Sequence, residues 1–255
     1  RGDCLSYLGL ARDLAAKLKT PLKTPECPLS RSDWDEAKSV KVSVDADAGC
    51  ARFTALPMRG LKALESPFWL KRRLNASGMR PINLLVDITN YVLLETGQPV
   101  HAYDERFVSG RQLKVRSAHK NDKLETLDGS QASLEPGDLL ICDAERPVGL
   151  AGIMGGANSE IKDDTEALIL EVAHFDPVQI RKSAKRLSLH TEASHRFERG
   201  INIDGLPDVS LRVASLIQSC SADAGNKDVQ IAESMVDWHP KPGNAPRIAL
   251  RLQRA

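Results

Sequence analysis

The sequence predicts an α+β fold in which a mixed or antiparallel core of strands is covered by a few helices. Apolar residues recur at helical spacing near both ends of the chain, whereas alternating and short buried runs fill its middle. Asp-Gly and Pro-Gly turns separate these short runs, as hairpins require. We therefore expect strands that pair mostly in antiparallel fashion, with helices packed against them.

Composition limits the classes of protein to which the chain can belong. Its 255 residues, 42% of them hydrophobic, are enough for one large domain or two ordinary ones. The 35 basic residues nearly balance 34 acidic ones, so the net charge is +1 and any contact with RNA must be local. Five widely spaced cysteines without a CxxC pair predict reduced thiols and a cytoplasmic protein.

Targeting signals are not visible in the sequence. No apolar run is long enough to span a bilayer, and residues 1–20 lack the charged, apolar and cleavage regions of a signal peptide. The chain has no start methionine, and we expect it to be a fragment of a longer protein.

The first predicted element is a helix over residues 3–19. Its leucines recur at helical spacing, and Asp3 or Ser6 can serve as the N-cap. Residues 20–39 contain three prolines among polar residues and are typical of a linker or crossing loop.

Two strands and a second helix follow. The alternation over residues 40–56 predicts two strands joined near Gly49, and residues 57–67 form a connection. The helix predicted over residues 68–77 is closed by Gly78. Its basic run favours a solvated face over an RNA contact, because charge alone more often marks a solvated surface.

Residues 80–104 form the stretch around which we expect the site to be organised. Residues 82–94 are apolar and β-branched but include asparagine and aspartate, so this buried element carries polar groups that need partners or a ligand. A polar run containing His101 follows this buried element directly. In that position a rigid scaffold can present the polar side chains to a substrate. Asn90 and His101 are therefore the first candidate site residues.

The middle of the chain predicts a series of strands and a glycine loop. Strands are expected over residues 111–118 and 138–144, with a pair of short strands over residues 126–134. Residues 148–161 contain four glycines, which indicate close backbone approach or positive φ. This segment is either a loop whose N–H groups face a ligand or a tight β corner, and glycine content alone leaves both open.

A further strand, over residues 165–175, carries Glu171 among apolar neighbours. A carboxylate in such a place is costly to bury without a partner, although exposed strand ends often carry glutamate. A basic helix is expected over residues 178–189, capped by Asp176. The mixed run at 190–200 is most simply an ion-pair network.

The last predicted elements are an amphipathic helix over residues 206–220 and a polar, proline-interrupted linker over residues 221–246.

Known catalytic motifs do not account for these residues. A phosphate loop, a dinucleotide fingerprint, a zinc-protease motif and a nucleophile elbow are all missing from the sequence. His101 and Asp104 could begin a metal site, but they are only two ligands, so metal binding is disfavoured. The polar groups that could converge are Asn90, His101, Gly152 to Gly156, Glu171 and Thr191.

Four long motifs carry a resemblance to a known family: RPINLLVDITNYVLLETGQPVHAYD, LAGIMGG, LILEVAHFDPVQIRKSAKRL and HTEASHRFERG. In this order and at these separations they closely resemble the beta subunit of bacterial phenylalanine-tRNA ligase. The resemblance divides the chain into a partial first module (1–56), an editing domain (57–235) and a linker with the start of the next module (236–255).

The resemblance implies proofreading by hydrolysis of the aminoacyl ester of mischarged Tyr-tRNA(Phe). Glu171 matches the glutamate that accepts a hydrogen bond from the tyrosine phenol, with the backbone of Gly152 beside it. Phenylalanine would leave that buried carboxylate unpaired, so the assignment is chemically apt.

The remaining site residues implied by the resemblance are catalytic candidates and pocket walls. His101 and Asn90 match residues that orient substrate and water, and Thr191 completes the catalytic set from the pocket wall. Ala193 and Gly155 match wall positions where small side chains leave room for the aminoacyl group.

The resemblance also implies partners. The beta subunit pairs with alpha subunits in an alpha2beta2 heterotetramer that binds tRNA(Phe), and ATP and magnesium serve the complete ligase. It implies no cofactor or metal for this segment. The alternative is a scaffold without catalysis, in which the basic residues at 181–186 contact tRNA or the alpha subunit.

Overall fold

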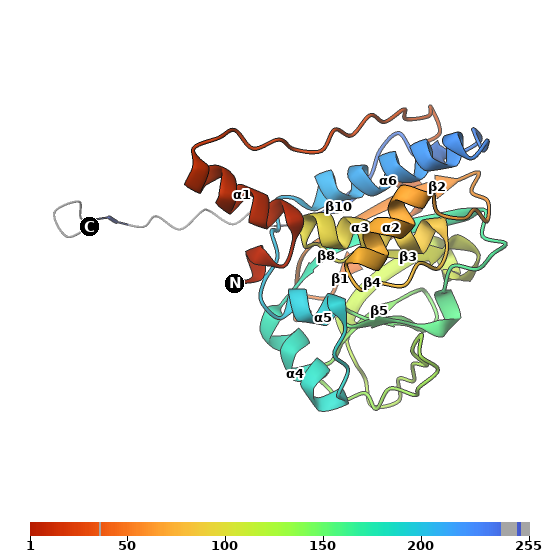
Figure 1. The fold of residues 1–255 in the computed structure, drawn as a ribbon. Coiled ribbons are helices and arrows are strands. Elements are labelled where there is room, and N and C mark those ends of the chain that lie inside the picture. The colour runs from red at the N-terminus through yellow and green to blue at the C-terminus, as the bar shows by residue number, and fades with distance from the viewer. Residues whose placement is uncertain (36, 241–248, 251–255) are drawn as a thin grey trace.

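Two five-stranded β-sheets pack face to face in the computed structural model, which describes residues 1–35, 37–240 and 249–250 (Figure 1). The first sheet is antiparallel and has the order β10-β2-β8-β3, with β9 also pairing with β2. Its strands are β2 (Cys50–Arg59), β3 (His101–Asp104), β8 (Ala167–Phe175), β9 (Gln230–Ile231) and β10 (Val236–Trp238).

The second sheet has the order β1-β4-β5-β6-β7. The β1–β4 pair of this sheet is parallel, and its other neighbouring strands pair in antiparallel fashion. Its strands are β1 (Lys41–Val44), β4 (Gln112–Ser117), β5 (Leu139–Cys142), β6 (Pro147–Leu150) and β7 (Met154–Gly155). The mixed pairing confirms the predicted α+β class with a mixed and antiparallel core.

Strands β2 and β8 separate two apolar cores. Successive side chains of a strand point to opposite faces, so Phe53 and Ala173 face the second sheet whereas Leu56 and Leu170 face helices. Both faces are buried, which explains why these strands are nearly continuous apolar runs in the sequence.

Three helices cover the outer face of the first sheet: α2 (Phe68–Ala76), α3 (Leu84–Thr96) and α6 (Leu206–Asp223). The buried element predicted at 82–94 is helix α3, which begins at the Asn83 cap and ends at Gly97 with φ +81°. Asp87 finds the partners that its burial demands, because its carboxylate accepts hydrogen bonds from Ser66 Oγ at 2.5 Å and from the Ile82 N–H at 2.7 Å.

Two further helices, α4 (Pro177–Leu187) and α5 (Glu192–Phe197), close one end of the space between the sheets (Figure 1). The Asp176 side chain caps α4 as predicted, accepting from the Gln179 N–H at 2.8 Å. Short 3-10 turns complete the described elements at Gly2–Cys4, Ala37–Ser39, Glu105–Phe107, Ser109–Arg111 and Ala157–Ser159.

Helix α1 (Tyr7–Leu18) begins at Ser6, one of the two predicted caps, whose Oγ accepts from the Gly9 N–H at 3.0 Å. Its apolar stripe is not buried: Leu10, Leu14 and Leu18 are 47, 59 and 66% exposed. Figure 1 shows this helix at the edge of the molecule, and its contacts are mainly with α3.

Two sequence expectations are wrong. Residues 126–134 do not form two strands, because Thr126, Asp128 and Ser130 hydrogen-bond one another in a tight turn that leaves only a single bridge between its flanks. Residues 221–246 are not simply a linker, since α6 extends to Asp223 and β9 and β10 both pair with β2. Such short strands depend on their partner strand for pairing, and their own sequence carries little periodicity.

The predicted module boundaries stay predictions. Strand β2 runs across the boundary placed between residues 56 and 57. Most of the expected start of the next module lies in residues 241–248 and 251–255, outside the described residues. Within the described part of the chain, no helix has the length and apolarity needed to cross a membrane.

Candidate active site

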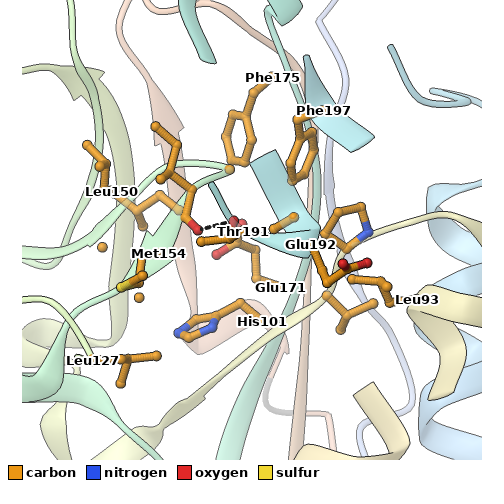
Figure 2. A pocket seen from close by; sticks show the side chains of 18 of the residues that line it. Leu93, His101, Leu127, Leu150, Met154, Glu171, Phe175, Thr191, Glu192 and Phe197 are labelled. Carbon is orange, nitrogen blue, oxygen red and sulfur yellow. Dashed lines mark hydrogen bonds between the residues drawn. The ribbon is translucent and has the colours of Figure 1, made fainter. Parts of the chain in front are cut away.

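A cavity of about 270 Å³ lies between the two sheets, beside the ends of α3 and α5. Figure 2 shows Glu171 and His101 directed into it, with Phe175 and Phe197 along one wall and Leu150 and Met154 along another. All seven residues predicted for the site line this one cavity: Asn90, His101, Gly152, Gly155, Glu171, Thr191 and Ala193. Its volume lies just below the roughly 300 Å³ at which small-molecule pockets begin, and it suits an amino-acid-sized group.

Glu171 is the buried charge of the cavity. It lies in the central strand β8, directly opposite His101 of β3 and Ala55 of β2, and is 5% exposed. Burial raises the pKa of the Glu171 carboxyl to about 7, against the opposing effect of a hydrogen bond from Tyr103. The buried surroundings therefore disfavour the ionised form of Glu171.

Tyr103 was not predicted as a site residue. Its hydroxyl donates to Glu171 Oε2 at 2.6 Å, and its ring packs edge-on against His101 with centroids 4.4 Å apart. The only signal in the sequence was its position two residues after His101, which places both side chains on one face of a strand. The partner Glu171 is 68 residues away, so periodicity could not reveal the contact.

His101 contributes a neutral imidazole to the cavity. Burial lowers the pKa of His101 to about 4, and its Nε2 is buried without a hydrogen-bond partner among the described residues. An unpartnered buried nitrogen marks a place where a ligand or water can bind. The ring lies directly against Gly155, where a Cβ atom would come within 2.5 Å of His101 Cε1.

The glycine segment forms the tight β corner that was one of its two predicted alternatives. It is a tight hairpin between β6 and β7, and the same hairpin forms a wall of the cavity. Gly152 has φ +67°, and a Cβ there would come within 3.0 to 3.1 Å of Ile180, Phe197 and Phe175. The predicted contact of its backbone with a ligand stays a prediction.

Thr191 joins α5 to the glycine hairpin. As the N-cap of α5, its Oγ1 accepts from the Ser194 N–H at 3.0 Å, and it donates to the Ile153 carbonyl at 2.8 Å. The hydroxyl proton is thus already used in the hydrogen bond to the Ile153 carbonyl, which supports a positioning role for Thr191. The predicted catalytic role of Thr191 stays a prediction. Ala193 lies two residues further along and presents only a methyl group to the cavity.

Thr191→Ala is expected to lower the free energy of unfolding of the chain by about 1–2 kcal/mol, because the helix loses its cap. Thr191→Ser keeps the hydroxyl and should lose much less. Urea denaturation of the two variants beside the wild type makes the comparison. Equal losses in both variants would show that the threonine methyl group, and not the cap, carries the effect.

Asn90 reaches the cavity from α3, beside Leu93. Its side chain is half-buried, and no hydrogen bond to another described residue holds its amide. The amide is therefore available to a ligand or water, and the predicted role of Asn90 in orienting substrate or water stays a prediction.

A metal site between His101 and Asp104 is ruled out by geometry. The two residues point to opposite faces of β3, and the Asp104 carboxylate already pairs with Arg106 at 2.7 Å and accepts from Thr165 at 2.6 Å. Among the described residues, Asp3, Cys4 and Asp13 have ligand atoms within 4.8 Å of one another at the surface. The Arg1 guanidinium already pairs with both of these carboxylates.

A larger cavity, of about 640 Å³, lies between α1 and α6. Its buried charges are already compensated, because Arg196 pairs with Glu192 at 2.6 Å and Arg212 pairs with Glu95 at 2.8 Å. Arg196 and Glu192 also confirm the ion pairing expected at 190–200. The smaller cavity, in contrast, contains the unpaired polar groups of His101 and Asn90, and we therefore favour it as the candidate active site.

The comparisons with known proteins identify the class. Residues 49–222 match the family model described as the B3/4 domain, and the chain belongs to this family. Over its whole length it is also similar to proteins named phenylalanine–tRNA ligase beta subunit. It is 42% identical to the one from Salinibacter ruber, covering 100% of this chain and 30% of that protein. It is 44% identical to the one from Geobacter metallireducens, covering 99% of this chain and 31% of that protein.

The chain thus spans less than a third of the length of these relatives. A solved N-terminal fragment of the phenylalanyl-tRNA synthetase beta subunit from Pyrococcus horikoshii aligns with 97% of this chain and 65% of that one, at 13% identity and a TM-score of 0.48.

Proposed function

We propose that this chain carries an editing site that hydrolyses the ester between tyrosine and tRNA(Phe), as part of a phenylalanine-tRNA ligase. The observation that carries the proposal is Glu171, a carboxylate buried in a mainly apolar cavity of amino-acid size. The similarity to beta subunits over the whole chain supports the same conclusion.

Glu171 has one acceptor oxygen to offer to a substrate. Tyr103 occupies Oε2, and no described residue donates a hydrogen bond to Oε1. Tyrosine differs from phenylalanine by a hydroxyl, and an apolar pocket rejects such an addition by only on the order of 100-fold. A second site that accepts a hydrogen bond from this hydroxyl supplies the missing discrimination, because phenylalanine would leave Glu171 Oε1 without a hydrogen bond.

The chemistry proposed is attack of water on the ester carbonyl. None of the residues that line the cavity is serine or cysteine, and the hydroxyl of Thr191 is already hydrogen-bonded. Water therefore adds to the carbonyl carbon, the ester C–O bond breaks, and the terminal ribose oxygen leaves with a proton. Asn90 and the neutral His101 orient the water, so that catalysis comes from positioning and electrostatics, assisted by a hydroxyl of the terminal adenosine.

The pH dependence should identify the titrating group. Because the pKa of Glu171 is about 7 and that of His101 about 4, the carboxylate loses its charge as the pH falls through 7 while the imidazole stays neutral. A protonated carboxyl is a weaker acceptor, so we expect tyrosine selectivity to fall with decreasing pH and to have its midpoint near 7.

This selectivity is the ratio of kcat/KM for Tyr-tRNA(Phe) to that for Phe-tRNA(Phe), measured between pH 5.5 and 8.5 after subtraction of the uncatalysed rate at each pH. A ratio that stays constant through pH 7 would contradict the assignment of Glu171 as the ionised acceptor.

The direct test of the function is deacylation of preformed Tyr-tRNA(Phe) and Phe-tRNA(Phe) by the complete ligase that contains this chain. We expect selective hydrolysis of the tyrosyl ester. Absence of such selectivity in the complete ligase would refute the proposal. The isolated chain, measured in parallel, shows whether the cavity needs the rest of the ligase to receive the tRNA end.

The proposal places the chain in the cytoplasm, in an alpha2beta2 ligase whose ATP and magnesium serve aminoacylation outside this segment. The alternative is a scaffold that contacts the alpha subunit or tRNA without catalysis. The exposed stripe of α1 favours some docking role, because a twelve-residue helix gains little stability alone in water. Intact assembly without any deacylation would support this alternative.

A further inference from the structure

The cavity already contains one phenol bound to the carboxylate proposed to recognise another. Tyr103 is 1% exposed, and its hydroxyl donates to Glu171 Oε2 at 2.6 Å. Burial raises the pKa of Tyr103 well above 10, so the phenol keeps its proton and remains a donor. The contact is a diagonal pair across β3 and β8, because His101 is the residue directly opposite Glu171 and Tyr103 is two positions further along.

We propose that Tyr103 is a positioning residue for tyrosine recognition: its phenol occupies Oε2 of Glu171 and thereby presents Oε1 to the phenol of the substrate. The inference rests on the proposed editing function. It assigns to Tyr103 a role that acts entirely through Glu171.

The first part of this role is orientation. A carboxylate can accept bonds at two oxygens and can rotate about its terminal bond. The bond from Tyr103 fixes one oxygen, and the Tyr103 ring is itself held edge-on against His101 at 4.4 Å with an interplanar angle of 76°. The other oxygen then has a defined direction and can serve one substrate phenol.

The second part is charge. Burial opposes ionisation of Glu171, and the hydrogen bond from Tyr103 is the interaction that favours the carboxylate. Without this bond, the carboxyl group would be protonated over a wider pH range. A protonated carboxyl is a weaker acceptor than a carboxylate, so it selects less strongly for a phenol that donates to it.

Tyr103→Phe in the complete ligase tests the inference, because it removes the hydroxyl and keeps the ring in the core. We expect kcat/KM for Tyr-tRNA(Phe) to fall about tenfold or more, as for loss of a hydrogen bond to a charged group. We also expect the pH midpoint of selectivity to rise by about one unit, since one pKa unit corresponds to an interaction of this size. Hydrolysis of Phe-tRNA(Phe) should not fall.

The matched control is Tyr7→Phe, which removes an exposed hydroxyl hydrogen-bonded to Ser77 on the surface. It should change neither the selectivity nor its pH midpoint. A structural role of Tyr103 would instead lower the rates for both esters equally and leave the midpoint unchanged, and this result would overturn the inference.

A double substitution covers the case in which Tyr103→Phe does not fold because it leaves the buried Glu171 charge without its partner. Tyr103→Phe combined with Glu171→Gln removes the hydroxyl together with the carboxylate that it serves, and it is compared with Glu171→Gln alone. If Tyr103 acts through Glu171, the two variants have the same kcat/KM for Tyr-tRNA(Phe). A further fall of this kcat/KM in the double variant would refute the inference.

The failure of this inference is distinguishable from failure of the proposed function. A wild-type ligase without tyrosine selectivity rejects the function itself. A selective wild type whose Tyr103→Phe variant keeps both the selectivity and its pH midpoint rejects only the role of Tyr103.

Discussion

Glu171→Gln should abolish the preference for the tyrosyl ester while leaving hydrolysis of the phenylalanyl ester nearly unchanged. The amide has almost the shape of the carboxylate, and its oxygen can still accept the bond from Tyr103. Its NH2 group then occupies the place of Oε1, so the proton of the substrate phenol loses its charged acceptor and the phenol oxygen gains only a neutral hydrogen bond in return. A charged hydrogen bond contributes about 1.5–3 kcal/mol, so Tyr-tRNA(Phe) hydrolysis should fall roughly 10- to 150-fold.

The measurement is the deacylation rate of both preformed aminoacyl-tRNAs by the complete ligase. Glu166→Gln is the matched control, because Glu166 immediately precedes β8 and is exposed. The control should behave as the wild type. Retained tyrosine selectivity in Glu171→Gln would remove Glu171 from its proposed role.

Gly155→Ala is the second substitution with a large expected effect. The added Cβ would come within 2.5 Å of His101 Cε1 and 3.0 Å of Nε2, so the imidazole must move away. Displacement of a positioning group by about 1 Å can lower a rate on the order of 100-fold, and we expect hydrolysis of Tyr-tRNA(Phe) to fall by about this factor.

Gly149→Ala is the natural control because Gly149 pairs directly with Gly155 across the β6–β7 hairpin. Its added Cβ would make only an ordinary contact, 3.6 Å from the Tyr103 hydroxyl. Deacylation and thermal unfolding should be measured for both variants, so that loss of folding is separated from loss of catalysis. A wild-type rate in Gly155→Ala would mean that the position of His101 is unimportant.

The sequence predicted which residues line the site better than it predicted which of them contact one another. The apolar run around Glu171 indicated a buried strand, and the polar run after residues 82–94 pointed to His101. The strand register that sets these two residues opposite each other is a property of pairing between distant segments, so local patterns could not establish it. The resemblance to a known family added Ala193, and it assigned roles to Gly152 and Gly155 within a glycine segment that the sequence had already singled out.

The residues that sequence reasoning missed or misassigned depend on long-range contacts. The role of Tyr103 becomes visible only when β3 lies beside β8. Strands β9 and β10 have two and three residues, too few for a periodic signal, and they form because β2 offers unpaired backbone groups. Helix α1 was predicted correctly, but the exposure of its leucines depends on what surrounds it.

Glu171 lies in a central strand, which should open later than the edge strand β7 in the wall of the cavity. Strand β8 pairs on both sides and has apolar cores on both faces, so its amide hydrogens should exchange only through global unfolding. Strand β7, with two residues at the edge of the other sheet, should exchange far sooner. We therefore expect the hairpin wall of the cavity to open locally while the Glu171 carboxylate stays fixed.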